Sequence, residues 1–208
     1  MRNGIQGTDN VVIDNKVALD NVVFDIRGNG NMIHLSENVI LNDTSIRIYG
    51  NGNKIYLKEN MAVESNIMIL MEGNENYLEI GKKTTLLAVN FVLADGSRII
   101  LGDDCMCSYD VHFRTSDQHS IIDGGGGGRI NWEKDIIIKD HVWFCANTRI
   151  QKGVTIAHET VVGLGAIVTK PILEPNVVVA GNPAKIVKKN INWLRERIQK
   201  MGEVIHTV

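Results

Sequence analysis

The sequence is poor in several residue types that dominate other proteins. Only 5% of its 208 residues are aromatic and only 3 are proline, whereas 20 are glycine and 44% are hydrophobic. A core with so few aromatic rings must be built mainly from Ile, Val and Leu. The length suits a single domain with a substantial core, or at most two small domains.

Cysteine is scarce as well. Cys105, Cys107 and Cys145 are odd in number and form no CxxC pair. The sequence therefore predicts neither a disulfide framework nor a bound metal. We interpret the three residues as reduced thiols that lie in the core or near a site.

The charge balance and the lack of long apolar runs exclude further classes. The net charge of −2 gives no general reason to expect binding to nucleic acid or to an anionic membrane surface. No run approaches the ~20 apolar residues of a transmembrane helix, and the opening MRNGIQGTDN has no apolar signal-peptide core. We therefore expect a cytoplasmic protein without an integral membrane segment.

The first half of the chain repeats itself. The motifs GNGNMIHL, GNGNKIYL and GNENYLEI begin at Gly28, Gly50 and Gly73, so the period is 22 to 23 residues. Apolar residues alternate inside each unit, which is typical of short strands with one buried face. The Gly and Asn residues predict turns because both tolerate positive φ. Such repeats indicate a solenoid whose coils stack around one core.

The second half has a shorter period of six residues. An apolar column consists of Ile138, Phe144, Ile150, Ile156, Val162 and Val168. Two positions before each of the last five stands a small or β-branched residue: Val142, Thr148, Val154, Thr160 and Ala166. One large and one small inward residue on each side predict a triangular parallel β-coil. A helix is disfavoured by this period and by the interrupting glycines.

The pattern changes after Pro183. Asn190 can cap a helix, because apolar residues recur on one face after it: Ile191, Leu194, Ile198 and Met201. We expect residues 1–189 to form an all-β solenoid domain from which a loop at about 114–133 is extruded. Residues 190–208 are expected to form a short C-terminal α-helix and a tail.

The segment RTSDQHSIIDGGGGGRINW, from Arg114 to Trp132, breaks the coil pattern. The five glycines are followed by no Lys-Ser or Lys-Thr pair, which argues against a phosphate loop. We interpret them as the tip of a loop that is weakly ordered without its acceptor. His119 lies in the same segment, and on residue type alone a solvated surface histidine is the commoner interpretation.

Taken together, the hexapeptide columns, the motif VVAGNPAKIVKK and the terminal helix resemble the left-handed parallel β-helix acyltransferases that use acetyl-CoA. The resemblance covers most of the chain, and residues 114–188 are its specific part. It is nearest to the bacterial polysialic acid and capsule O-acetyltransferases in three respects. These are the Asn/Gly-rich first coils, the turn that ends in His119, and the 24 residues between His119 and Trp143 of HVW. The left hand is implied by the resemblance alone, since general crossover rules favour the right hand.

The resemblance implies an acetyl-CoA-dependent O-acetyltransferase of a bacterial surface-glycan sugar, such as polysialic acid or another capsular or O-antigen sugar. His119 would be the general base, because an imidazole with a pKa of about 6.5 can remove the proton of an acceptor hydroxyl. Trp143, which alone would pass for a large residue facing away from the coil, becomes an active-site residue. Direct transfer is expected, since no Ser or Cys has an obvious base partner. The resemblance also implies a homotrimer with active sites between subunits.

The remaining site residues are implied in the same way. Coenzyme A would contact Cys145, Gly163, Gly165, Ala166, Lys170, Asn182, Pro183, Lys185 and Lys188. The acceptor would contact Arg114, Asp117, Arg129 and Trp132. The alternatives are ordinary: lysines and arginines are commonly solvated, and an aspartate in a turn commonly forms an Asx turn. One departure stands next to Trp143, where VWFCAN has Phe144 and Cys145 and the family usually has VWIGAN.

Three other functions stay open. The chain could acetylate a hydroxyl or an amine of a nucleotide-linked sugar or another small molecule. A zinc carbonic anhydrase of the same fold would need a pair of histidines five residues apart, which the sequence lacks. A non-catalytic β-solenoid scaffold or adhesin would be expected to have long uniform repeats and a secretion signal. The identity of the acceptor cannot be derived from the sequence.

Overall fold

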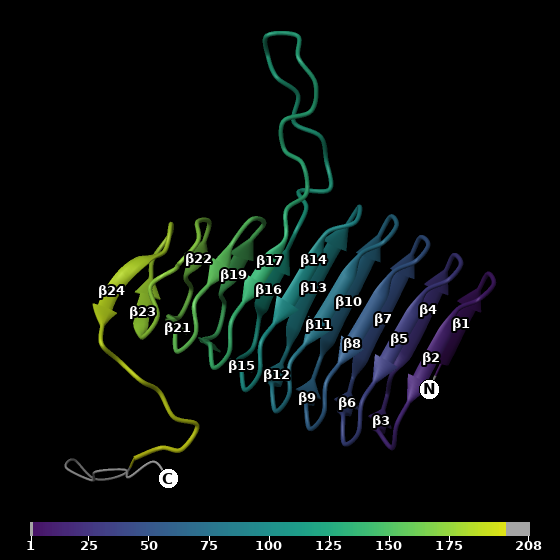
Figure 1. Cartoon of the computed structure of the whole chain (residues 1–208), viewed down its shortest axis with the longest axis horizontal. Coiled ribbons are helices and arrows are strands. Elements are labelled where there is room, and N and C mark those ends of the chain that lie inside the picture. Colours follow the sequence, from purple (N-terminus) through teal and green to yellow (C-terminus); the bar gives the residue numbers. More distant parts are fainter. Residues whose placement is uncertain (1, 199–208) are drawn as a thin grey trace.

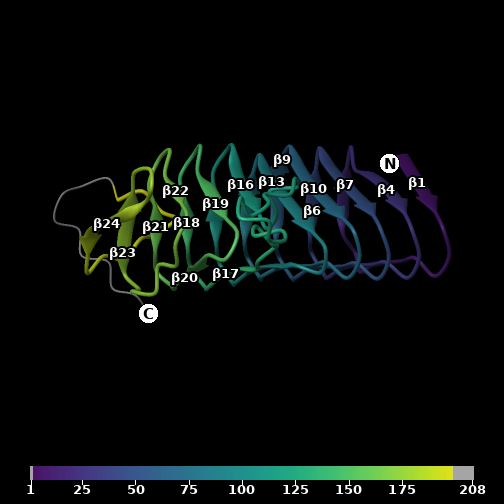
Figure 2. The ribbon, with the colours of Figure 1, turned by 90° about the horizontal axis from the view of Figure 1, so that it is seen from above.

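The computed structural model describes residues 2–198, and over these residues the chain is an all-β solenoid of parallel strands (Figure 1). The coils stack along the long axis, with the N-terminal coil at one end and β23 and β24 at the other (Figure 2). Each coil contributes one strand to each of three sheets, here named A, B and C. The predicted fold class is confirmed; the left hand stays implied by the resemblance.

Sheet A has eight strands and sheet B has seven. Sheet A contains β1 (Arg2–Gln6), β4 (Val23–Arg27), β7 (Thr44–Tyr49), β10 (Ile67–Glu72), β13 (Val89–Ala94), β16 (Val111–Arg114), β19 (Arg149–Gln151) and β22 (Ile167–Val168). Sheet B contains β2 (Val11–Asp14), β5 (Met32–Leu35), β8 (Lys54–Leu57), β11 (Tyr77–Ile80), β14 (Arg98–Leu101), β17 (Ile136–Ile138) and β20 (Thr155–Ile156).

Sheet C has nine strands, of which the last, β24, is antiparallel to β23. It contains β3 (Ala18–Asp20), β6 (Ile40–Asn42), β9 (Ala62–Ser65), β12 (Thr85–Leu87), β15 (Met106–Cys107), β18 (Trp143–Phe144), β21 (Val161–Val162), β23 (Val177–Ala180) and β24 (Lys185–Lys189). The long repeats of the first half are therefore whole coils, and the hexads of the second half are single sides of shorter coils.

The core is the column of inward-facing side chains that the sequence pattern predicts. All six members of the hexad column are at most 1% exposed, and the small residues that precede them are 0% exposed. In sheet B, Ile33 is in register with Ile55, which is in register with Leu78 of the next coil. Identical inward positions thus stack directly on each other, which explains why the apolar residues recur so strictly.

The repeated Asn and Gly residues form stacked turns. Asn31 and Asn53 are buried, and Oδ1 of Asn31 accepts from the backbone N of Asn53 at 2.9 Å and from its Nδ2 at 3.0 Å. Asn53 repeats this pattern with Asn76 at 2.9 and 2.8 Å. A Cβ on Gly28, where φ is +138°, would lie only 2.0 Å from the carbonyl oxygen of Gly50. Side-chain amides therefore satisfy the buried turn backbone, and glycine permits the close spacing.

A long loop leaves the solenoid between β16 and β17, at residues 115–135 (Figure 1). Its two arms pair as a narrow hairpin: Ile122 and Arg129 form an antiparallel bridge, and the backbone N of Ile130 donates to the oxygen of Ile121 at 2.9 Å. The glycines at 124–128 form its tip. The extruded loop is confirmed at nearly the predicted bounds, whereas its weak order without acceptor stays a prediction.

The C-terminal helix predicted from Asn190 is wrong over residues 190–198, where the structure has no helix. The chain is irregular there, and individual side chains bind the solenoid. Trp193 is 5% exposed and donates from Nε1 to the oxygen of His141 at 2.8 Å. Arg195 donates to Asp104 at 2.8 Å. The rest of the predicted helix, including Met201, lies outside the described residues.

No helix within residues 2–198 has the length and apolar character needed to cross a membrane. The cytoplasmic location stays a prediction.

Candidate active site

His119 lies at the base of the extruded loop, with its backbone held and its side chain exposed. The backbone N of His119 donates to the oxygen of Asp117 at 2.7 Å, and its carbonyl oxygen accepts from Nδ2 of Asn131 at 2.8 Å. Among the residues that the structure describes, none hydrogen-bonds to the imidazole. The ring is therefore presented to solvent with both nitrogens accessible to a substrate.

Asp117 anchors the loop rather than the histidine. Its Oδ2 accepts from Asn131 at 2.8 Å and also from Nζ of Lys152, with which it forms an ion pair. The hydrogen bond from Lys152 is the main cause of the lowered pKa of Asp117, and burial opposes it. Asp117 makes no bond to the His119 ring. In this structure Asp117 thus orients the loop through Asn131 and Lys152.

A second polar cluster closes the other side of the loop base. Arg129 donates to Glu133 at 2.6 Å, and Glu133 also accepts from Ser116 at 2.8 Å. Burial alone would raise the pKa of Glu133, but hydrogen bonds led by that from Arg129 outweigh it, so the pKa is lowered. Arg129 is thus engaged inside the loop, and its guanidinium lies 4.9 Å from the ring centre of Trp132.

A bridge across sheet A steadies the residue before His119. Arg114 donates to Oε1 of Gln118 at 2.6 Å, and Nε2 of Gln118 donates to Glu72 on β10 at 2.7 Å. Gln118 itself has φ of +61°, a value that few non-glycine residues adopt. Of the four predicted acceptor residues, Arg114, Asp117 and Arg129 therefore already have partners within the chain, while the side chain of Trp132 is 60% exposed.

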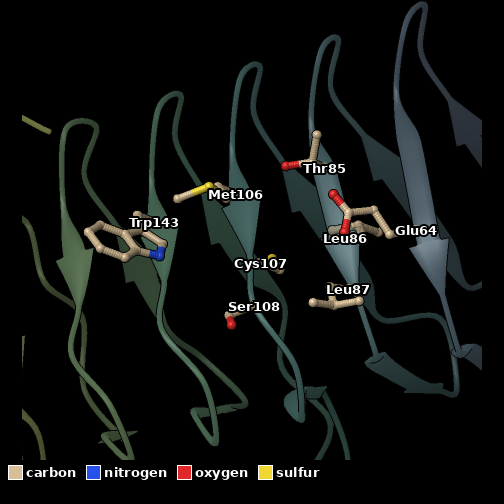
Figure 3. Close-up of a pocket in the computed structure, with 8 residues that line it drawn as sticks. All are labelled: Glu64, Thr85, Leu86, Leu87, Met106, Cys107, Ser108 and Trp143. Atoms are coloured by element: carbon tan, nitrogen blue, oxygen red, sulfur yellow. The ribbon is translucent and has the colours of Figure 1, made fainter. Parts of the chain in front are cut away.

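Trp143 lies on the outer face of sheet C, where it lines a cavity of about 250 Å³. The cavity extends over neighbouring coils toward the N-terminus, past Met106 to Leu87 and Glu64 (Figure 3). Figure 3 shows the indole with its nitrogen-bearing edge turned toward Cys107. No described residue hydrogen-bonds to Nε1 of Trp143, so this donor is available to a ligand.

One chain does not bring His119 and Trp143 together. The loop of His119 joins β16 of sheet A to β17 of sheet B, so it emerges at the edge between these two sheets. Trp143 faces outward from sheet C, the side of the triangular coil opposite that edge. A site that contains both side chains therefore needs two copies of the chain.

The backbone around Trp143 is already paired. The N–H of Trp143 donates to the oxygen of Thr160 and the N–H of Cys145 donates to the oxygen of Val162, both at 2.9 Å. Neither N–H is therefore free to stabilise an oxyanion. Nε1 of Trp143, by contrast, has no hydrogen-bond partner among the described residues, and a free N–H donor of this kind can stabilise an oxyanion.

The small residues of the predicted coenzyme A groove have structural reasons of their own. A Cβ on Gly163 would lie 3.1 Å from the oxygen of Val179, a tight contact, so close coil packing favours glycine there. Ala166 is 0% exposed, and its N–H donates to the oxygen of Gly163 at 3.1 Å. Gly165 is exposed and has φ of +69°. Contacts of a ligand with Ala166 would therefore be made through the backbone of this turn.

The predicted basic group lies at the C-terminal end of the solenoid. Lys185 and Lys188 are exposed on β24, and Lys170 is exposed after β22. Asn182 and Pro183, in the turn between β23 and β24, are exposed as well. Lys189 differs because it forms an ion pair with Glu174 at 2.8 Å. Three lysines of this end thus stay available to an anionic ligand.

The surroundings of the cysteines disfavour the thiolate form that a nucleophile needs. All three are free thiols, as expected, and Cys105 and Cys107 are buried. Burial raises the pKa of Cys105 to about 12, and it also raises the pKa of Cys145. Since a thiol must ionise to attack, these residues do not offer covalent catalysis. No group of three potential metal ligands occurs within residues 2–198.

Comparison with known proteins gives concordant matches in sequence and structure, although no family model matches the chain. The polysialic acid O-acetyltransferase of Neisseria meningitidis is 35% identical over 192 residues, which cover 92% of this chain and 88% of that protein. The chain belongs to the polysialic acid O-acetyltransferase family. The solved polysialic acid O-acetyltransferase OatWY superposes with a TM-score of 0.91 and 32% identity, over 97% of this chain and 95% of that one.

A second member of the polysialic acid O-acetyltransferase family is more similar over a shorter region. The enzyme of Escherichia coli O1:K1 is 44% identical over 117 residues, or 56% of this chain, but this match spans only 38% of its length. The chain is thus a member of an acyltransferase family, as the sequence motifs indicated.

Sequence reasoning missed the residues that hold the loop. Asn131 is 8% exposed and binds both Asp117 and His119, while Lys152 adds a bond to the oxygen of Asn131 at 2.8 Å. Asn131 lies within the irregular segment 114–132, so its position in the sequence could have marked it as a candidate loop residue. Lys152 gave none, because it follows β19 and meets the loop only through coil stacking.

Proposed function

We propose that this protein is an acetyl-CoA-dependent O-acetyltransferase whose acceptor is a hydroxyl of polysialic acid. The carrying observation is the match to the polysialic acid O-acetyltransferases in sequence and fold over nearly the whole chain. The geometry supports the same chemistry, because an exposed histidine is held by its backbone at the base of a loop that projects beyond its own solenoid.

His119 acts as the general base in direct transfer. The imidazole takes the proton of the acceptor hydroxyl while the oxygen attacks the thioester carbonyl of acetyl-CoA, forming the new C–O bond. Collapse of the tetrahedral intermediate breaks the C–S bond, and the protonated imidazole returns its proton to the thiolate of coenzyme A. The buried cysteines take no part in these reaction steps.

The complete site forms between copies of the chain in a homotrimer. The loop of one subunit carries His119, and the outer face of sheet C in the next carries Trp143. The exposed apolar residues of the loop suit such a docking: Ile121, Ile122, Ile130 and Trp132 are each 54% to 62% exposed. Burying them against a neighbouring subunit would remove an apolar patch from water.

The lysines at the C-terminal end bind the phosphates of the donor. Lys170, Lys185 and Lys188 are exposed and unpaired among the described residues, and ammonium groups pair favourably with phosphate. The exposed turn from Asn182 to Pro183 lies beside them. The bound acetyl-CoA would then reach from this end toward Trp143 on β18, which is separated from β23 in sheet C by β21.

The test is an acetyl-transfer assay with acetyl-CoA and purified polysialic acid. Release of the free thiol of coenzyme A measures the rate, and NMR of the product locates the new ester. Wild-type protein should form an ester, and His119→Ala should lose roughly 10²–10⁴-fold in kcat if the histidine is a general base. The matched control is His158→Ala, since His158 is exposed on the connection between β20 and β21, at the edge between sheets B and C rather than the edge that carries the loop. If the protein acetylates only monomeric sialic acid, a nucleotide-linked sugar or an amine, the proposed acceptor is wrong. Unchanged turnover of His119→Ala would refute the role of the base.

A further inference from the structure

The C-terminal segment, here residues 190–195, runs back across the coils along the edge between sheets B and C. It begins beside Asn176, which exchanges hydrogen bonds with the backbone of Ile191 at 3.0 and 3.1 Å. It then contacts His141, which precedes β18, and Asp104, which precedes β15. The segment therefore spans several coils and passes the one that carries Trp143.

Trp193 is the centre of this contact. Its ring lies parallel to the imidazole of His141, with 4.0 Å between centroids and 9° between planes. Its Nε1 donates to the oxygen of His141 at 2.8 Å. The ring centroid is 5.9 Å from that of Trp143 at 44°. At this separation two aromatic rings interact directly, so Trp193 supports one side of the Trp143 indole.

His141 and Arg195, which lie beside Trp193, are themselves held by hydrogen bonds. Nδ1 of His141 lies 2.6 Å from Oε2 of Glu159. Arg195 donates to Asp104 at 2.8 Å and to the oxygen of Cys105 at 2.9 Å. The same guanidinium donates to Oγ1 of Thr85, a residue that lines the Trp143 cavity, at 2.8 Å.

We propose that Trp193 is a positioning residue that holds the Trp143 indole in its place beside the cavity. This inference rests on the proposed function, in which Trp143 of one subunit completes the site that holds His119 of another. The end of the chain thereby becomes a supporting wall of the active site, since Arg195 fixes the segment and Trp193 meets the indole. Without this support the ring can turn away while the coil beneath it, built from the core columns, stays intact.

The first arm of the test follows Trp143 directly and does not depend on catalysis. The chain has 3 tryptophans, so Trp132→Phe/Trp193→Phe and Trp132→Phe/Trp193→Ala proteins each retain only Trp143. Acrylamide quenching of its fluorescence should be roughly twofold stronger in the Ala protein, because one side of the ring loses its aromatic neighbour. Equal quenching in the two proteins would overturn the proposal, whatever the activity.

The second arm compares kinetics in the single variants. Trp193→Ala should lower kcat about 10-fold or more, as expected for a small misplacement near the chemistry, with little change in KM for acetyl-CoA. Trp193→Phe, which keeps a ring beside Trp143, should restore most of kcat. Arg195→Ala should shift both readouts in the same direction but less, and Arg197→Ala is its matched control because Arg197 is exposed without a described partner.

The outcomes separate the two proposals. An active wild-type enzyme with unchanged kcat in Trp193→Ala would overturn the positioning role and leave the proposed function intact. If the wild type transfers no acetyl group, the proposed function fails, and the quenching arm alone decides whether Trp193 holds Trp143. If Trp193→Ala does not fold, Arg195→Ala decides: absence of any shift in quenching or kcat relative to Arg197→Ala would overturn the proposal.

Discussion

Replacing Asn131 by alanine should reduce catalysis without unfolding the solenoid. The Asn131 amide makes four hydrogen bonds at the loop base, to Asp117 and His119 at 2.8 Å, from Ile121 at 2.8 Å and from Arg129 at 3.2 Å. At about 0.5–1.5 kcal/mol each, they contribute roughly 2–6 kcal/mol to the order of the loop. Their loss frees the backbone that presents His119.

The expected loss of kcat follows from the displacement of His119. A displacement of about 1 Å can cost about 10²-fold in rate, so we expect Asn131→Ala to lower kcat by roughly 10- to 10²-fold. The loop lies outside the stacked coils and shares no strand ladder with them, so it can open locally. The melting temperature should therefore change by less than about 2–4 °C, the shift that about 1 kcal/mol causes in a protein of this size.

The assay combines steady-state acetyl transfer with differential scanning calorimetry of the same preparations. Asp123→Ala is the control, because Asp123 lies near the loop tip and its carboxylate accepts one hydrogen bond among the described residues, from the backbone N of Gly125 at 3.2 Å. It should change neither readout. Wild-type kcat in Asn131→Ala, or a fall in kcat matched by unfolding of the whole protein, would refute the reasoning.

Two further predictions concern the turn ladder and the loop base. Asn53→Ala should lower the free energy of unfolding by about 2–6 kcal/mol in urea titrations, because it leaves the Gly73 oxygen and the Asn76 N–H without their partner. The control Asn74→Ala changes an exposed residue and should lower it by less than about 1 kcal/mol. Equal losses in the two variants would contradict the stabilising role of the stacked asparagines. Asp117 has a lowered pKa, caused first by Lys152, so its stabilising effect is present above the unfolded pKa of about 3.9 and is lost as the pH falls through the folded value. Amide hydrogen exchange of residues 117–133, corrected for intrinsic rates, should therefore be slower in wild type than in Asp117→Asn at neutral pH. The two rates should converge only as the pH falls below the lowered pKa of Asp117. A difference that persists once Asp117 is protonated would show that the ion pair is not its cause.

The structure clarifies which parts of the site a single sequence can show. His119 could be proposed because it lies in the segment that interrupts a strict repeat, and Trp143 because its spacing from His119 matches a family motif. Lys152 could not be found, since its partner Asp117 is 35 residues away. The prediction of a C-terminal helix was wrong for a related reason. Its apolar spacing suits a helix, but Trp193 and Arg195 bind distant turns of the solenoid, and these contacts replace the helix over residues 190–198.

The sequence by itself determined the coils, because every inward position of a stacked solenoid meets the same environment and therefore repeats the same residue types. It also determined where the repeat is interrupted, and hence where the candidate base lies. Only the tertiary structure decided that His119 and Trp143 lie on opposite sides of one chain, and that the C-terminal segment reaches Trp143. These facts depend on which edge of the triangle each turn occupies and on single side-chain contacts between remote residues, neither of which leaves a period in the sequence.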